Sequence, residues 1–286
     1  MILLHGFSAL LYAGLAAYFW HTRWHSGRAL AQRGRTRDLD GNQGFRWWER
    51  LLLAAAVVLH AFLLAHAIFG SGQFHFGFAH ALSMMALLAL LFYGAESFIH
   101  PLEGMPALVL PPAALSVALP AMFGGALLTD KAQAPAFVAH VLIAMLAYAF
   151  IAIAAAHAVL MAAVERRLHS RRGSGRDLAE PSGLPPLLTM ERLLFQVLGI
   201  GFVCLSLTVL SGIVFSEEIF GRALTFDHKT VFGLLAWLIF AVLLLGRAIY
   251  GWRGRAALNG TFAGFGALLL AYVGSRFVLE VMLGRV

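Results

Sequence analysis

The chain has 286 residues, of which 60% are hydrophobic and only 12% are charged, with a formal net charge of +7. Soluble proteins carry roughly 25% charged residues, so this composition excludes an ordinary soluble domain and indicates an integral membrane protein. Arginines facing anionic lipid at a membrane surface explain the positive charge, and we therefore expect no binding of nucleic acid.

Runs of about 20 mainly apolar residues are long enough to cross a bilayer as helices. Eight such runs follow one another along the chain, at 1–20, 49–69, 77–99, 105–128, 135–164, 190–216, 230–250 and 257–281. The first four runs fill residues 1–130 and the last four fill 135–286. We predict an all-α, multi-pass helix bundle that forms a single membrane domain over 1–286.

Arginines are concentrated in three connecting segments, and all three fall on the same side of the predicted membrane. They are Arg23, Arg28, Arg33, Arg35, Arg37, Arg46 and Arg50, then Arg166, Arg167, Arg171, Arg172 and Arg176, and finally Arg247, Arg253 and Arg255. Positive residues mark the cytoplasmic side of a membrane protein. With an even number of helices, we expect both termini and the 217–229 loop on the outer, periplasmic side.

Six of the twelve histidines fall in the outer half of this arrangement: His60, His66, His75, His80, His140 and His228. A membrane-buried imidazole is costly and is usually retained for a ligand, a proton or a metal. Two helices that each present a histidine at the same depth would ligate haem iron from both faces. We predict His60 and His140 as the axial pair, with His66, His80 or His228 as substitutes, because the sequence does not reveal which helices are neighbours.

The haem would be bound non-covalently, as b-type haem. The chain has one cysteine, Cys204, and lacks the CxxCH motif of covalent attachment.

The run 225–255, TFDHKTVFGLLAWLIFAVLLLGRAIYGWRGR, resembles the tryptophan-rich segment of the CcsA/CcmC-like cytochrome c assembly family. The matching positions are Asp227, Lys229, Trp237 and 251–254. The departures are Phe226, His228 and Thr230, where the family has a tryptophan, a proline and a glutamate. The runs 140–148, HVLIAMLAY, and 187–202, LLTMERLLFQVLGIGF, also resemble the family, the latter most closely its short YpjD/CorE-like inner-membrane branch.

This resemblance implies a protein of the bacterial inner membrane that holds or moves haem at the outer face for cytochrome c assembly. It implies His140 as one outer ligand, and as partners haem, other maturation membrane proteins or an apocytochrome. Lys229 and the start of the following helix suit the haem propionates, and Phe226, Asp227, His228 and Trp237 complete the predicted binding residues. The family's second outer histidine, expected after the last helix, has no counterpart in the ending SRFVLEVMLGRV.

Two other functions are open at this stage. Outer histidines together with Glu96, Glu103 or Glu280 would suit a divalent-metal transporter or an accessory subunit of one. A cytochrome b-like electron carrier would use His157 for an inner haem. The sequence has no hydrolytic triad, phosphate loop or HExxH motif, so we expect a binding protein and not an enzyme.

Overall fold

The computed structural model describes residues 1–25, 45–70, 74–100, 102, 104–127, 135–172, 187–220 and 228–282, with side chains except at 24–25, 126–127, 167–172 and 215–220. The main helices of these segments are α1 (Ile2–Phe19), α3 (Trp47–Phe69), α4 (Phe78–Ile99), α5 (Pro106–Met122), α6 (Pro135–Arg172), α7 (Leu187–Phe220), α8 (His228–Tyr250) and α9 (Arg255–Leu269). The all-α membrane bundle is thus confirmed.

Shorter elements extend two of these helices and join two others. A π-helical turn, η1 (Trp20–His25), continues α1, and α9 continues through η4 (Leu270–Gly274), α10 (Ser275–Phe277) and η5 (Val278–Met282). Two short antiparallel strands, β1 (His75–Phe76) and β2 (Ala126–Leu127), pair His75 with Leu127 and Phe76 with Ala126. This pairing joins the segment before α4 to the segment after α5.

Seven of the described helical segments are long and apolar enough to cross a membrane, and α5 is shorter. We predicted the fourth run over 105–128, but the helix ends at Met122. After it, Gly125 takes φ +71°, in the region that favours glycine, and the chain enters β2. At 17 residues and about 1.5 Å per residue, α5 is about 25 Å long, which is close to the minimum for a span.

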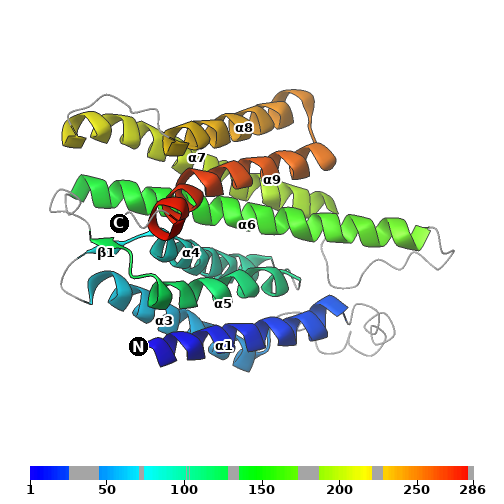
Figure 1. Ribbon diagram of the computed structural model, residues 1–286. Coiled ribbons are helices and arrows are strands. Elements are labelled where there is room, and N and C mark those ends of the chain that lie inside the picture. The colour runs from blue at the N-terminus through cyan, green and yellow to red at the C-terminus, as the bar shows by residue number, and fades with distance from the viewer. Residues whose placement is uncertain are drawn as a thin grey trace.

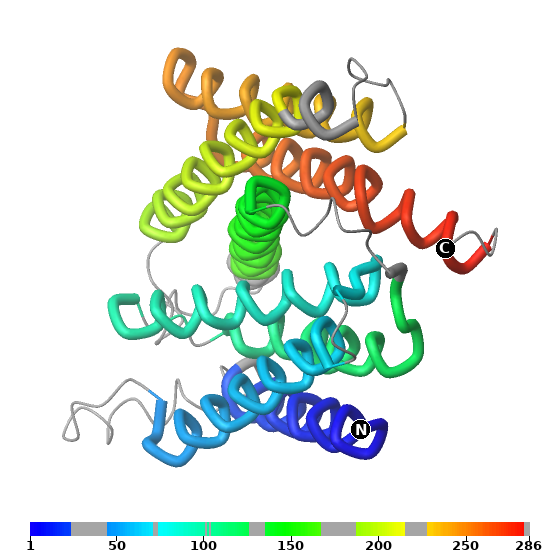
Figure 2. The backbone as a smooth tube through the Cα atoms, turned by 90° about the vertical axis from the view of Figure 1, so that its left-hand side faces the viewer, coloured from blue at the N-terminus to red at the C-terminus, as the bar shows by residue number. Residues whose placement is uncertain are grey.

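Helix α6 lies at the centre of the bundle, where Figure 2 shows it nearly end-on. It packs against α4 on one side and against α7 and α9 on the other, while α1 and α3 lie beyond α4 and α5 (Figure 1). One apolar core joins α1, α3, α4, α5 and α6 and includes residues of α7 and α9, and another joins α6 to α7, α8 and α9 and includes residues of α3 and α4. The central helix contributes to both cores and contacts both halves.

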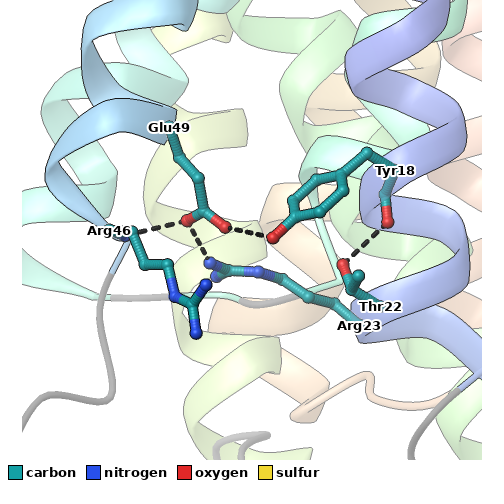
Figure 3. Close-up of polar contacts among 5 residues, drawn as sticks. All are labelled: Tyr18, Thr22, Arg23, Arg46 and Glu49. Atoms are coloured by element: carbon teal, nitrogen blue, oxygen red, sulfur yellow. Dashed lines mark hydrogen bonds and ion pairs between the residues drawn. The ribbon is translucent and has the colours of Figure 1, made fainter.

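The bundle has two ends, which we name after a residue at each. The His80 end carries β1, β2 and the first residues of α4, α6 and α8 (left in Figure 1). The Glu49 end carries a polar network that ties α1 to α3 (Figure 3). There, the Glu49 carboxylate accepts hydrogen bonds from the Arg23 guanidinium, from the Tyr18 hydroxyl at 3.0 Å and from the Arg46 backbone N–H at 2.8 Å.

Candidate functional site

His80 is a buried imidazole at the start of α4. It is the third residue of that helix and is 1% exposed. In the described part of the chain the ring interacts with the backbone of Ala67, on α3, but neither ring nitrogen makes a hydrogen bond of good geometry. Its ring lies 6.2 Å from the ring of Phe76, centroid to centroid. Because buried polar atoms are nearly always paired, and the backbone of Ala67 can satisfy at most one ring nitrogen, the other nitrogen points to a missing ligand.

His140, in the second turn of α6, has its ring oriented by α7. Its Nδ1 lies 2.8 Å from the Oγ of Ser211, and that hydroxyl donates to the carbonyl of Thr208 at 3.1 Å. Since a serine hydroxyl has a single proton, the imidazole Nδ1–H must donate to Ser211. The lone pair of the neutral ring is then on Nε2. This arrangement, with one nitrogen held by a hydrogen bond and the other basic, is that of a metal-ligating histidine.

A row of side chains from five elements, β1, α4, α6, α8 and η4, includes these two histidines. The Tyr272 ring, in η4, lies 6.4 Å from the ring of Phe76, which in turn contacts His80. On its other side, Tyr272 has the Nζ of Lys229 at 5.4 Å from its ring centroid. The charge of Lys229, at the second position of α8, also acts on His140. We call these five residues, Phe76, His80, His140, Lys229 and Tyr272, the His80 cluster.

His60, one member of the predicted axial pair, is fully buried in the other half of the bundle. Its Nε2 lies 2.8 Å from the Oγ of Ser83, and its Nδ1 lies 3.3 Å from the hydroxyl of Tyr12. Both ring nitrogens are therefore used within the protein, by partners on α4 and α1. The ring of His140 is held by α7 instead, so the pairing of His60 with His140 stays a prediction.

The remaining predicted residues occupy different environments. His228 is exposed at the first position of α8, whereas Phe226 and Asp227 lie outside the described residues. Trp237 lies two turns further along α8, where its Nε1–H donates to the Oγ of Ser206 at 2.9 Å and its ring stacks on that of Phe202. Trp237 thus fixes α8 on α7, and its predicted contact with a cofactor stays a prediction.

The acidic residues that we weighed for metal binding are spread over the molecule. Glu96 pairs with Nε2 of His157 at 3.1 Å, Glu280 approaches the start of α4, and Glu103 lies outside the described residues. In the described ranges, no group of three or more histidine, cysteine, aspartate or glutamate side chains is placed to hold a metal ion. No observation in the structure therefore favours the divalent-metal function.

Three contributors to the site were missed in the sequence: Ser211, Tyr272 and Gly125. Each of them contacts a site residue that lies far away in the sequence. Only Gly125, which follows Gly124, gave a local signal, because two adjacent glycines indicate a turn. A Cβ atom on Gly125 would lie 2.9 Å from Nδ1 of His80, so the close approach of the two segments requires glycine there.

Comparison with known proteins decides the family. A family model described as cytochrome C assembly protein matches residues 47–283, which is most of the chain. The chain belongs to the cytochrome c assembly protein family. This membership supports a role in cytochrome c biogenesis and implies involvement of haem.

Individual relatives agree with this assignment. Inner membrane protein YpjD of Escherichia coli K12 is 31% identical over 170 residues, which are 59% of this chain and 62% of that protein. Cytochrome c biogenesis protein CcsA of Heterosigma akashiwo is 38% identical over 93 residues, which are 32% of this chain and 29% of that protein. A 28.8 kDa protein of Azospirillum brasilense is 27% identical over 256 residues, 86% of this chain and 89% of its own length. No solved structure gives a significant match.

Together with the apolar helices, these relatives identify a multi-pass protein of the bacterial inner membrane. The chain spans less than two thirds of the E. coli relative that it matches.

Proposed function

We propose that this protein binds haem non-covalently at the His80 cluster and holds or moves it for cytochrome c assembly, without turning over a substrate of its own. The observation that carries the proposal is His80, which is 1% exposed and has at least one ring nitrogen without a hydrogen bond in the described structure. Bound haem would supply an iron that accepts an imidazole nitrogen, and thereby a partner for the ring nitrogen that the backbone of Ala67 does not satisfy.

The other members of the cluster suit the same ligand. Nε2 of His140 carries the lone pair because Nδ1 is engaged by Ser211, so this ring suits an iron ligand as well. Phe76 and Tyr272 supply apolar ring surface of the kind that lines a porphyrin. The ammonium group of Lys229 is exposed at the start of α8, where the helix dipole adds to the attraction for a propionate.

We further propose that the His80 end faces the periplasm. The arginines of the Glu49 end, among them Arg23, Arg247 and Arg253, mark that end as cytoplasmic by the positive-inside rule. Haem at the His80 cluster would then lie near the outer surface, within reach of an apocytochrome or of another maturation protein.

The test is an optical spectrum of the detergent-purified protein, oxidised and reduced, as isolated and after addition of haem. We expect a Soret band that is weakened in His80→Ala and in His140→Ala and unchanged in His21→Ala, an exposed histidine at the Glu49 end. His60→Ala is measured beside them: loss of the band there, with retention in His80→Ala, would restore the His60–His140 pair. A wild-type protein that stays colourless after haem is added would refute the proposal.

A further inference from the structure

The backbone segments that contain Gly77 and Gly125 cross directly beside His80. A Cβ atom on Gly77 would lie 2.9 Å from the Cα of Gly125, so the segment before α4 and the segment after α5 are in close backbone contact. The same added Cβ on Gly77 would lie 2.7 Å from Oε2 of Glu280, whereas one on Gly125 would lie 2.9 Å from Nδ1 of His80. The Glu280 carboxylate and the His80 ring therefore lie on either side of one glycine crossing.

Glu280 comes from the far end of the chain, in η5, and its carboxylate takes the place of a helix cap. Gly77 precedes α4 and has no side chain with which to cap it. Oε2 of Glu280 instead accepts the backbone N–H of Phe78, the first residue of α4, at 3.4 Å. A carboxylate at this position is stabilised by the positive end of the helix dipole as well as by the hydrogen bond.

The burial of the Glu280 carboxylate strengthens its interaction with the start of α4. Its side chain is 8% exposed, Nη1 of Arg276 lies 3.9 Å from Oε1, and Oε1 has no hydrogen-bond partner in the described structure. One turn earlier, the Phe277 ring packs edge-on against the Phe78 ring at 5.4 Å. The C-terminal helical segment therefore contacts Phe78, the first residue of α4, in two ways. The Phe277 ring packs against the Phe78 ring, and the Glu280 carboxylate accepts the Phe78 backbone N–H.

We propose that Glu280 is a positioning residue for His80. His80 is two residues after Phe78, within the same first turn of α4, so the group that fixes this turn also fixes the imidazole. Without the carboxylate, the first turn of α4 frays and the ring leaves its buried position beside Phe76. The role assigned to the ring rests on the proposed function, but the coupling between Glu280 and His80 does not require haem.

The coupling is measured in haem-free protein by the exchange of the imidazole C2 hydrogen with deuterium, followed by mass spectrometry of His-containing peptides. Glu280→Ala is expected to raise the exchange rate at His80 about fivefold, equivalent to about 1 kcal/mol of charge–dipole interaction. Glu280→Gln is expected to raise it less, because the amide oxygen still accepts from Phe78 but lacks the charge. Buried His5 and His60 report on folding of the rest of the bundle and should keep their wild-type rates.

Glu165→Gln, which removes a carboxylate at the Glu49 end, is the matched control and should leave His80 unchanged. An unchanged rate at His80 in Glu280→Ala, with His5 and His60 also unchanged, would overturn the positioning role. Titration with haem then separates the two proposals. If His80 responds to Glu280 but the wild-type protein binds no haem, the positioning role stands and the proposed function falls. If both hold, haem affinity should decrease in the order wild type, Glu280→Gln, Glu280→Ala.

Discussion

Replacement of Glu49 by glutamine is expected to destabilise this protein more than the loss of any single hydrogen bond in the same network. The Glu49 side chain is 2% exposed and faces the Arg23 guanidinium, which is 13% exposed (Figure 3). Glutamine has nearly the same shape but no charge. The substitution would therefore leave the guanidinium largely out of water with no counter-charge.

The magnitude follows from the burial of both partners. Breaking a buried ion pair from one side costs about 3–5 kcal/mol, because the remaining charge is uncompensated. The guanidinium also lies over the rings of Phe19 and Phe45, at 5.1 and 4.6 Å from their centroids. These cation–π contacts persist in the variant and offset about 1 kcal/mol. We therefore expect a loss of about 3 kcal/mol in the free energy of unfolding.

Two comparison variants separate charge from hydrogen bonding. Tyr18→Phe removes one hydrogen bond to the same carboxylate and is expected to cost about 1.5 kcal/mol. The double variant Arg23→Met/Glu49→Leu removes both charges and should recover much of the stability lost in Glu49→Gln. Unfolding free energies in bicelles, measured by steric trapping, give all three values. A Glu49→Gln variant that loses no more than Tyr18→Phe would refute the reasoning.

Two further predictions concern orientation and packing. In a background without the native cysteine, Gly124→Cys should react with an impermeant maleimide on intact spheroplasts, and Arg253→Cys only after the membrane is opened; the reverse pattern would invert the proposed orientation. On α9, Gly264→Ala places a methyl 2.4 Å from a phenylalanine ring of α8 and should cost about 1–3 kcal/mol, whereas Gly266→Ala meets nothing within 4 Å and should be nearly neutral. Equal unfolding free energies for these two variants would contradict the packing.

Helix positions could be predicted from the sequence because each apolar run is close to the length of a span. The run 230–250, for example, became α8 with a start only two residues earlier. The errors occur where polar residues or glycines decide the boundary. Helix α6 continues to Arg172, eight residues beyond the predicted end, since its charged residues are good helix formers that need no apolar environment.

The candidate site was less accessible to sequence reasoning because it depends on which helices are neighbours. His80 and His140 were both recognised as candidate ligands, yet nothing near either residue in the chain indicated Ser211 or Tyr272 as neighbours. Similarly, Tyr12 is 48 residues away from His60, to which it is hydrogen-bonded. The depth of a histidine can be counted along one helix, whereas the partners of its ring nitrogens are set by packing between helices.

The first helix shows how such polar contacts determine structure within a membrane. Helix α1 precedes the family match, which begins at residue 47. Most of its side chains are apolar, and apolar helices gain no hydrophobic energy by associating in lipid. Its place is fixed instead by polar side chains: Nδ1 of His5 lies 2.6 Å from the carbonyl of Val117 on α5, and the hydroxyl of Tyr12 reaches His60 on α3.

These two side chains are seven residues apart on α1, which places them on one face two turns apart. Arg23 adds a third contact, to Glu49, at the opposite end. A slide of α1 by one turn, about 5.4 Å, would break all three contacts at once and leave buried charges and imidazoles unpaired. His60 therefore anchors α1 at a defined depth, which accounts physically for a fully buried histidine with both ring nitrogens engaged. In His80, by contrast, neither ring nitrogen makes a hydrogen bond of good geometry in the described part of the chain.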